Sequence, residues 1–317
     1  MILQILHPVL LTETEHEDNF MKSGTNYQRI SSLLKSKQYY NQFCCGQLPL
    51  PNYLECLMAD QDEIISQGFT LDDLYLTSRT PINEREFIYS DLQHLKNCGI
   101  IDHTHYSIDA FDALRSRIWS TYEHRDNQTY IFPEEEHLAF AVSEIINPKF
   151  ICVLGSYYGY WASWLAPLHA NAAHITLIDP DKKVLDLAES NFSKLSIKNA
   201  SFICADGVTH LMDNHDIYDF FMLDAEGSID HHLPDYRGKN IYGPLIRAAT
   251  QRAASDAFLI THNIIISEIA NVSYFEDKAD KNSCILSSFI DTVSSQWAGL
   301  IEIGTTEGVG LAKRGRR

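Results

Sequence analysis

From about residue 130 onward, short β-branched and aromatic runs alternate with amphipathic stretches of helical period. This alternation is typical of strands and helices wound around a mostly parallel sheet whose two faces are covered by helices. The strand candidates are FICVLG, HITLID, ASFICAD, YDFFMLD, AFLITHN, LIEIG and GVGLAK. The helix candidates lie before and between them, at 134–146, 159–169, 181–195, 208–213, 241–254 and 281–296. The pattern therefore predicts an α/β fold with a seven-stranded, doubly wound sheet.

The last two strand candidates are joined only by the turn-prone residues TTEG. So short a connection favours an antiparallel pair, because parallel neighbours need a crossover of about a dozen residues or more. The sheet is therefore expected to be parallel except for an antiparallel terminal hairpin.

The first 125 residues show helical periodicity and hardly any strand pattern. A chain of 317 residues also exceeds what one hydrophobic core usually serves. We therefore expect two domains, a mainly α-helical one over 1–125 and a second over 126–317. Within the first, residues 71–108 read as a short helix, a turn, a longer helix ended at Gly99 and two extended pieces, which resembles a winged helix. The longer helix carries more acid than base, which favours dimerisation or covering a substrate over binding DNA.

Charge and hydropathy narrow the classes of partner. The 42 acidic residues against 25 basic ones give a net charge of −17, which repels a phosphate backbone and argues against nucleic acid as the main partner. No apolar run is long enough to cross a bilayer, and the apolar start MILQILHPVLL lacks a basic region and a cleavage site. Seven scattered cysteines without a C-x-x-C pair are typical of reduced, buried thiols. These observations predict a cytoplasmic protein without a membrane segment or signal peptide.

The run ICVLGSYYGYWASWLA predicts a buried strand that ends at Gly155, a turn through SYY and a helix from Gly159. Glycine lets the backbone approach a ligand closely, and the start of a helix offers free N–H groups. The spacing is G-x-x-x-G and not G-x-G-x-x-G, and any tight turn between strand and helix favours glycine. The loop alone therefore leaves a cofactor site and a structural turn open, and its aromatic residues are expected to belong mainly to the core.

Acidic residues end the next two strand candidates, Asp179 in HITLID and Asp206 in ASFICAD. The carboxyl ends of parallel strands meet at one edge of a sheet, where open α/β folds bind ligands and an acid can accept hydrogen bonds from ribose hydroxyls. A single acid at a strand end is commonly a turn residue or a helix cap. Three successive strand ends that carry Gly155, Asp179 and Asp206 favour a nucleoside-binding edge.

Over residues 125–317 these segments together resemble the class I S-adenosylmethionine-dependent methyltransferases, a Rossmann-like family, and among them the catechol O-methyltransferase-like small-molecule O-methyltransferases. YIFPEEEHLAFAVSEI resembles the family's lead-in helix, and VLGSYYGYWASWLA resembles its glycine loop. LIDPDKKVLDLAESNF is similar to its ribose-binding segment, and ICADGVTHL is similar to its adenine-side segment. YDFFMLDAEG resembles its fourth strand, and IEIGTTEGVGLAKR resembles its closing hairpin.

The resemblance implies that S-adenosylmethionine is the cofactor. It places Gly155, Ser156 and Gly159 at the methionine part. It places Asp179 at the ribose and Asp206 at the adenine. Neighbours in the same motifs are assigned to the cofactor site as well: Tyr157, Pro180, Gly207 and Asp224.

One departure from the family is Val153, which stands where an acid usually precedes the glycine loop. Contact to the ammonium group of the cofactor must then come from elsewhere. An NAD-dependent dehydrogenase is the rival interpretation of the same glycine loop. This interpretation accounts poorly for the antiparallel terminal hairpin and for the missing third glycine.

The family holds a divalent metal, commonly magnesium, on an aspartate that ends the fourth strand and an Asp-Asn pair that ends the fifth. Here the fourth strand ends at Asp224 and the fifth at His262 and Asn263, so a histidine replaces one aspartate. Gly227 stands where many members have a lysine. Between the two strands lies an added segment, SIDHHLPDYRGKN, that is longer than is usual in the family.

Three roles for the end of the fifth strand follow from this resemblance. In the first, Asp224, His262 and Asn263 bind a metal, and the imidazole shifts the preference from magnesium toward manganese, iron or zinc. In the second, the metal is lost, and His262 or one of His231 and His232 acts as a general base. In the third, the polar residues only cap the strand. Asp224 and the three histidines are therefore the catalytic candidates.

The resulting expectation is an S-adenosylmethionine-dependent O-methyltransferase that acts on a small hydroxylated acceptor, aromatic or natural-product-like, and that forms a homodimer. Two alternatives stay open. One is a methyltransferase of the same fold that modifies tRNA, against which the acidic charge argues. The other is a protein that binds the cofactor without transferring methyl, as a regulator or as a catalyst of another rearrangement.

Overall fold

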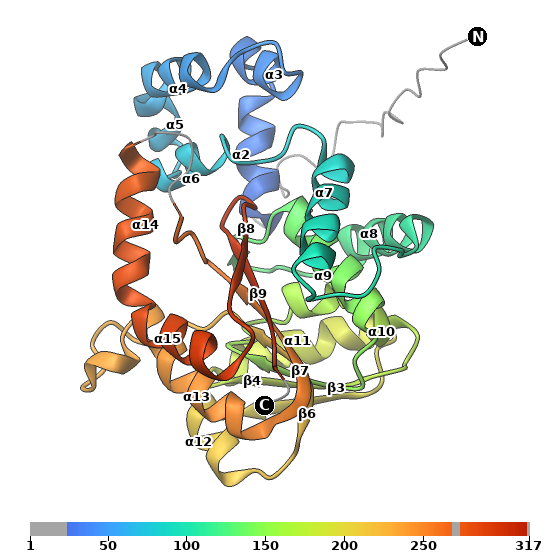
Figure 1. Ribbon diagram of the computed structural model, residues 1–317. Coiled ribbons are helices and arrows are strands. Elements are labelled where there is room, and N and C mark those ends of the chain that lie inside the picture. The colour runs from blue at the N-terminus through green and yellow to red at the C-terminus, as the bar shows by residue number, and fades with distance from the viewer. Residues whose placement is uncertain (1–23, 268–272, 316–317) are drawn as a thin grey trace.

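The structure is a computed structural model that describes residues 24–267 and 273–315. Within these residues the strands of the main sheet are Phe150–Leu154 (β3), His174–Asp179 (β4), Ala200–Cys204 (β5), Tyr218–Leu223 (β6), Ala253–His262 (β7), Ile301–Ile303 (β8) and Val309–Lys313 (β9). Their order across the sheet is β5-β4-β3-β6-β7-β9-β8 (Figure 1). Strands β3 to β7 are parallel, and β9 is antiparallel to both of its neighbours. The predicted seven-stranded sheet and its antiparallel terminal hairpin are confirmed.

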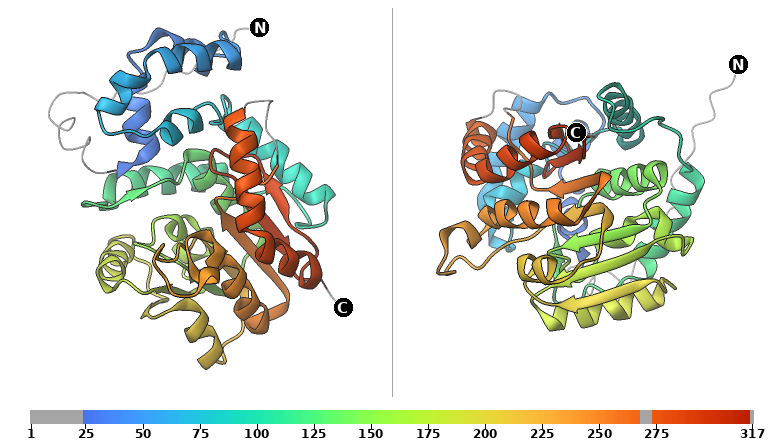
Figure 2. Two further views of the ribbon diagram at one scale, coloured as in Figure 1. Left: turned by 90° about the vertical axis from the view of Figure 1, so that its left-hand side faces the viewer. Right: turned by 60° about the horizontal axis from the view of Figure 1, so that its bottom comes forward.

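Helices cover both faces of this sheet, as expected of a doubly wound fold (Figure 2). Successive residues of a strand point to opposite faces. Along β3, Ile151 and Val153 belong to one buried cluster, whereas Cys152 and Leu154 belong to another. The first cluster includes Pro133–Ile146 (α9) and Lys182–Lys194 (α11), and the second includes Gly207–Asp213 (α12), Tyr242–Arg252 (α13) and Ser287–Gln296 (α15).

The helix predicted at 159–169 is interrupted. It consists of a 3-10 helix, Trp161–Trp164 (η1), and a short α-helix, Ala166–His169 (α10). Leu165 between them has an extended backbone, because Pro167 has no N–H for a continuous helix and suits the first turn of a new one. The expected α-helical N-terminus directly after the glycine loop is therefore wrong.

The helix predicted at 281–296 is also divided. It corresponds to the end of Ser273–Ile285 (α14) together with α15, and the two helices meet at Leu286. The Leu286 side chain is buried and its backbone leaves the helical region with ψ of 4°. This change of direction lets α15 cover the sheet while α14 extends toward the N-terminal helices (Figure 1).

The N-terminal part is helical, as predicted. Its helices are Asn26–Leu34 (α2), Gln38–Cys44 (α3), Leu50–Ala59 (α4), Gln61–Ser66 (α5), Leu71–Leu76 (α6), Glu84–Asn97 (α7) and Ile108–Thr121 (α8). The expected stop at Gly99 is present, with φ of 74°. Residues 100–107 form no strand, and Ile100 and Ile101 are buried in the cluster to which α7 and α8 also contribute. The resemblance to a winged helix is therefore not borne out.

The N-terminal helices pack in two places. Helices α2 to α6 contribute to a buried cluster of their own. Helices α7 and α8 share the cluster that covers the first face of the main sheet. A short parallel pair, Gly24–Thr25 (β1) with Gln128–Thr129 (β2), links the start of the described chain to the segment before α9. A domain boundary at residue 125 therefore stays a prediction. None of the helices described has the length and apolar character required to cross a membrane.

Candidate active site

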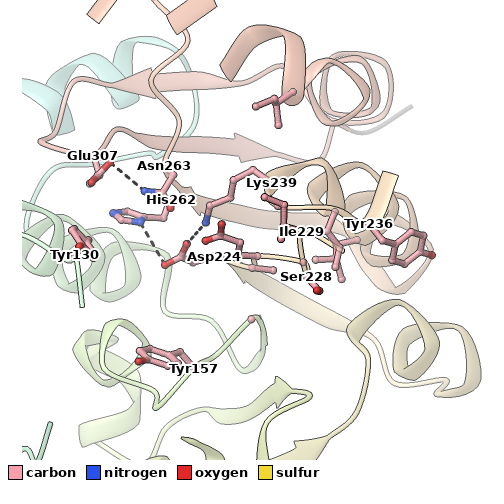
Figure 3. Close-up of a pocket in the computed structure, with 18 of the residues that line it drawn as sticks. Tyr130, Tyr157, Asp224, Ser228, Ile229, Tyr236, Lys239, His262, Asn263 and Glu307 are labelled. Atoms are coloured by element: carbon pink, nitrogen blue, oxygen red, sulfur yellow. Dashed lines mark hydrogen bonds and ion pairs between the residues drawn. The ribbon is translucent and has the colours of Figure 1, made fainter. Parts of the chain in front are cut away.

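A cavity of about 1490 Å³ lies at the carboxyl edge of the main sheet (Figure 3). The ends of five parallel strands contribute to its wall, through Gly155 after β3, Asp179 of β4, Asp206 after β5, Asp224 after β6 and His262 of β7. Other parts of the wall come from α6, α14, residues 128–130 and the segment between β6 and α13. The parallel sheet thus brings together, around one opening, five residues that the sequence singled out.

Gly155 packs directly against the chain after β6. A Cβ atom at this position would lie 2.4 Å from the Ala225 Cα atom and 2.6 Å from the Asp224 carbonyl oxygen. Its φ of 72° lies in the left-handed region, where glycine has no steric cost. Both observations require glycine, so the two strand ends meet at a distance that no side chain would permit.

Two aspartates hold the loops that follow β3 and β5. The Asp179 carboxylate accepts hydrogen bonds from the backbone N–H of Tyr157 at 2.8 Å and of Asp181 at 2.9 Å, and burial raises its pKa. Asp206 is the N-cap of α12, and its Oδ1 accepts from the Thr209 backbone N–H at 2.8 Å and from the Thr209 hydroxyl at 2.9 Å. A carboxylate offers about four acceptor positions. Both residues can therefore hold backbone and still accept hydrogen bonds from a ligand.

The other proposed cofactor residues differ in their positions. Pro180 and Gly207 line the main cavity, whereas Ser156 lines a small adjoining cavity of about 40 Å³. The Ser156 hydroxyl is buried and has no hydrogen-bond partner among the described residues. Gly159 lines neither cavity, and a Cβ there would lie 3.0 Å from the Phe192 ring of α11. Gly159 therefore lets the loop pack against α11.

Four charged side chains alternate in sign beside the cavity, and we call them the charge network: Glu135, His262, Asp224 and Lys239. His262 Nε2 lies 3.0 Å from Glu135 Oε2, and His262 Nδ1 lies 3.4 Å from Asp224 Oδ2. Lys239 Nζ lies 3.0 Å from Asp224 Oδ1. Figure 3 shows His262, Asp224 and Lys239 in a row at the cavity wall. His262 thus lies between two carboxylates, and Asp224 lies between the His262 ring and the Lys239 ammonium.

The network fixes the charges of its members. Burial alone would lower the pKa of His262, but the carboxylates of Glu135 and Asp224 raise it to about 10. Burial would raise the pKa of Asp224, but Lys239 and His262 hold it well below its usual range. His262 is therefore an imidazolium at neutral pH. Both ring nitrogens face carboxylates in this arrangement, which suits an imidazolium because it has two N–H donors.

Glu135 is fully buried in the first turn of α9. Its carboxylate accepts hydrogen bonds from the backbone N–H groups of Phe132 and Glu307, both at 2.9 Å, and from the Thr305 hydroxyl at 2.8 Å. Together with His262, these donors occupy about as many positions as one carboxylate offers. Helix α9 thus holds a buried, fully paired anion against the end of β7.

The sequence pattern did not identify Glu135 or Lys239. Acids in the first turn of a helix are favoured by the helix dipole and are ordinarily exposed, so PEEEHLAFAV indicates only a helix start. Lys239 lies in the added segment, which has no periodicity to place it. The available signal for Glu135 was the apolar run that follows the three acids directly, because it leaves no polar face for them.

Glu134, beside Glu135, supports a prediction about pH. It is buried, it accepts a hydrogen bond from the Thr306 backbone N–H at 2.8 Å, and burial together with the Glu135 charge raises its pKa to about 8. Because the pKa of Glu134 is higher in the fold than in the unfolded chain, its contribution to the unfolding free energy is fully present below pH 4.5. This contribution is lost as the pH rises through about 8. We expect Glu134→Gln, which resembles the protonated acid, to lessen the decline in unfolding free energy between pH 6 and 9 by roughly 1 to 3 kcal/mol.

Urea unfolding of the wild type and Glu134→Gln at several pH values measures this difference. Glu55→Gln, a change on an exposed side chain, is the control and is expected to leave the pH dependence unchanged. Parallel pH curves for the wild type and Glu134→Gln would show that Glu134 keeps an ordinary pKa in the fold.

The proposed metal ligands do not fit a divalent cation as they are arranged. Both nitrogens of His262 face carboxylates, and the Lys239 ammonium lies against Asp224. The Asn263 side-chain amide donates to Glu307 Oε2 at 3.3 Å. In residues 24–267 and 273–315, no group of three His, Cys, Asp or Glu side chains is placed to hold a metal ion. The position next to Asp224 is thus taken by a positive side chain.

The two histidines of the added segment have contacts within their own loop. His231 lines the cavity, but its Nδ1 accepts from the Leu233 backbone N–H at 3.2 Å and its ring stacks on Tyr236 at 5.1 Å. His232 is exposed and does not line the cavity. The contacts of His231 are local to its own loop, so a role as general base stays a prediction for both residues.

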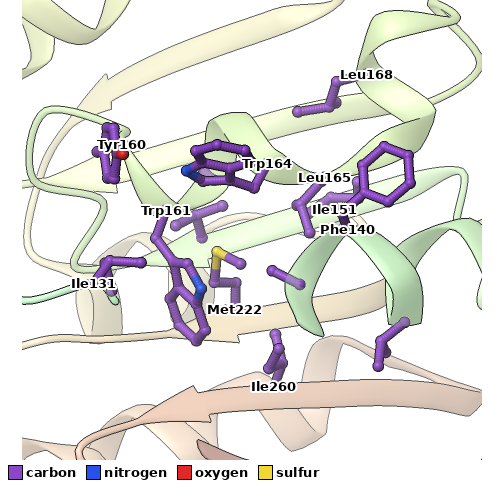
Figure 4. Close-up of a cluster of buried hydrophobic side chains, with 14 of the residues drawn as sticks. Ile131, Phe140, Ile151, Tyr160, Trp161, Trp164, Leu165, Leu168, Met222 and Ile260 are labelled. Carbon is purple, nitrogen blue, oxygen red and sulfur yellow. The ribbon is translucent and has the colours of Figure 1, made fainter. Parts of the chain in front are cut away.

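The aromatic residues of the glycine loop and of the segment after it belong mainly to the core, as expected (Figure 4). Tyr158, Tyr160, Trp161 and Trp164 are buried. The Tyr160 hydroxyl donates to buried Glu136 at 2.6 Å. Tyr157 differs, because it is 40% exposed and lines the cavity. Of these residues, Tyr157 is the one placed to stack on a ligand.

No protein-family model matches the sequence, and no curated protein matches it significantly. Comparison with solved structures finds similarity to methyltransferases. The SAH-bound methyltransferase PaMTH1 of Podospora anserina is 14% identical with a TM-score of 0.45, and the match covers 71% of this chain and 95% of that one. An O-methyltransferase from Bacillus cereus in complex with SAH is 13% identical with a TM-score of 0.43, and the match covers 72% and 99%. Identities and TM-scores this low do not assign the chain to a family.

Proposed function

We propose that the protein is an S-adenosylmethionine-dependent methyltransferase that methylates an oxygen of a small hydroxylated acceptor. The observation that carries this proposal is the convergence of Gly155, Asp179 and Asp206 on one cavity, from three neighbouring strand ends. A glycine that admits close approach, followed by two carboxylates, suits the methionine part, the ribose and the adenine of the cofactor in that order. The antiparallel terminal hairpin agrees with the same family resemblance.

The size and lining of the cavity support two ligands side by side. A pocket for one small molecule usually has a volume of about 300 to 1000 Å³, and this cavity has about 1490 Å³. Its lining includes the aspartates at the ends of β4 and β5 and also Tyr130, Lys239 and Tyr274. The aspartates suit the cofactor, and the aromatic rings and the cation suit a phenol-like acceptor.

The cofactor supplies an electrophilic methyl group, so the protein has mainly to position the acceptor oxygen and favour its negative charge. A tRNA-modifying methyltransferase is the first alternative. The net charge of −17 disfavours it, because binding a phosphate backbone depends on positive charge. Tight, salt-sensitive binding of bulk tRNA in a filter assay would favour this alternative.

The second alternative is a protein that binds the cofactor without transferring methyl. It predicts binding of S-adenosylhomocysteine but no labelled product with any phenol.

The cofactor assignment predicts that Asp179→Ala lowers the affinity for S-adenosylhomocysteine at least about tenfold, which is about 1.4 kcal/mol. Asp179 lines the cavity, and its carboxylate would lose both the ligand and the loop contacts to Tyr157 and Asp181. Isothermal titration calorimetry measures the affinity. Transfer from labelled S-adenosylmethionine to a panel of phenols and catechols measures the activity.

Asp219→Ala is the matched control. The Asp219 carboxylate accepts from the backbone N–H of Lys149 at 2.8 Å and of Phe150 at 2.9 Å, at the amino end of β3 and away from the cavity. The variant loses a similar pair of backbone contacts, so we expect a similar loss of stability with less than about a twofold change in affinity. Equal loss of affinity in both variants would mean that Asp179 acts only through the fold.

A further inference from the structure

The added segment between β6 and α13 is closed at its base. Gly227 and Gly238 exchange backbone hydrogen bonds of 3.0 Å in both directions, as an isolated antiparallel bridge. A Cβ atom on Gly227 would lie 1.8 Å from the Tyr236 carbonyl oxygen, so only glycine permits this closure. The segment therefore returns to the point where it left the sheet, and Lys239 follows beside Asp224.

Contacts on both sides hold the Lys239 ammonium in place. Its Nζ lies 3.0 Å from Asp224 Oδ1 and 3.4 Å from the Tyr242 hydroxyl oxygen. The Tyr242 hydroxyl donates in turn to the His262 carbonyl oxygen at 3.0 Å, which ties this corner to the end of β7. The Lys239 side chain is 23% exposed and lines the cavity. An ammonium has three N–H donors, and the two contacts direct two of them toward protein.

Charge supports a role for this cation. The Lys239 ammonium lies 3.0 Å from one oxygen of Asp224 and the His262 ring lies 3.4 Å from the other, so a cation of this chain already faces the carboxylate. A divalent cation next to Asp224 would have to displace the ammonium at 3.0 Å or lie against it. The position that the family resemblance gives to a metal is therefore occupied by a side chain of this chain itself.

We propose that Lys239 takes the place of a divalent metal at Asp224 and binds the oxygen of the acceptor. This inference rests on the proposed function for its chemistry. The acceptor O–H bond breaks and its proton passes to water, while Lys239 stabilises the oxyanion. An oxygen lone pair forms the new O–C bond, and the electron pair of the broken C–S bond stays on the sulfur. Lys239 is thus a catalytic residue, and Asp224 and Tyr242 position it.

The first test needs neither a substrate nor activity. Binding of Mn²⁺ to the chelator-treated protein is followed by electron paramagnetic resonance. We expect Lys239→Ala to bind Mn²⁺ at least about tenfold more tightly than the wild type, because an unbalanced carboxylate then faces the cavity. Adding Asp224→Asn to Lys239→Ala should remove this gain. Lys281→Ala, which removes another lysine that lines the cavity, should show none.

The opposite results overturn the inference. Tight Mn²⁺ binding by the wild type that Asp224→Asn abolishes would mean that a metal displaces Lys239. Equal Mn²⁺ binding by the wild type and Lys239→Ala would mean that Lys239 does not occupy a cation position.

The second test measures methyl transfer. The wild type should keep its activity after chelation of divalent ions. Lys239→Met should lower kcat about 100-fold with the affinity for S-adenosylhomocysteine within about threefold, and Lys239→Arg should recover part of the rate. Activity that requires added Mg²⁺ would overturn the inference. Failure of the wild type to transfer methyl to any acceptor would count against the proposed function, whereas the Mn²⁺ result would still decide the place of Lys239.

Discussion

Replacing Glu135 by alanine is expected to lower the free energy of unfolding by about 3 to 5 kcal/mol, because it removes one of the two carboxylates that face the buried His262 ring. The carboxylate is fully buried and lies 3.0 Å from the His262 imidazolium, and it also accepts from Phe132, Thr305 and Glu307. Its loss would remove all of these contacts. Urea unfolding at pH 7 measures the effect.

Glu86→Ala is the matched control, because Glu86 occupies the same third helical position in α7 but is exposed. It is expected to cost less than about 1 kcal/mol. A double-mutant cycle with His262→Ala should return a coupling energy above roughly 1.5 kcal/mol. A coupling near zero would show that Glu135 and His262 do not stabilise each other, and would remove the reason for an imidazolium at the cavity.

Replacing Gly155 by alanine is expected to reduce S-adenosylhomocysteine binding at least about 100-fold and to destabilise the fold by about 2 to 4 kcal/mol. The added Cβ would lie 2.4 Å from the Ala225 Cα atom, so the ends of β3 and β6 would have to separate. These two strand ends form the centre of the cavity edge. Calorimetric titration measures the binding, and thermal unfolding measures the stability.

The control for this variant is Gly99→Ala. Gly99 has a φ of 74°, close to the 72° of Gly155, but a Cβ there would meet no atom within 4 Å. The Gly99 variant therefore isolates the cost of the left-handed backbone, about 1 to 2 kcal/mol, from the cost of the close approach. If both variants bind the cofactor as the wild type does, the close approach at Gly155 has no part in the site.

The sheet and the cofactor edge could be predicted from the sequence because both depend on short-range patterns. A buried parallel strand is a local apolar run, and a parallel sheet places the ends of such runs at one edge. Asp179 and Asp206 were therefore found without knowledge of the tertiary structure. The breaks at Leu165 and Leu286 were missed, because one depends on Pro167 and the other on where a single side chain is buried.

The charge network could not be predicted, because its members come from four separate segments. The resemblance drew attention to Asp224 and His262, but the state of His262 depends on Glu135, which lies 127 positions away. Lys239 reaches Asp224 only because Gly227 and Gly238 close the added segment. A pattern in the sequence carries no information on such distances. The same pattern therefore left a metal site and a general base as equally reasonable hypotheses.

The proposed cofactor residues and the residues that hold Glu135 lie far apart along the chain, and this separation affects the order in which they fold during synthesis. The proposed cofactor residues lie between 155 and 224, whereas Glu135 is paired with Thr305 and Glu307 across 170 and 172 positions. During synthesis the ribosome releases the cofactor edge well before the terminal hairpin. The pairing of Glu135 with Thr305 and Glu307 forms late, because the chain between these residues must first be ordered. We therefore expect a newly made chain to gain affinity for its cofactor before it can position an acceptor, so a stalled or shortened chain would bind without turnover.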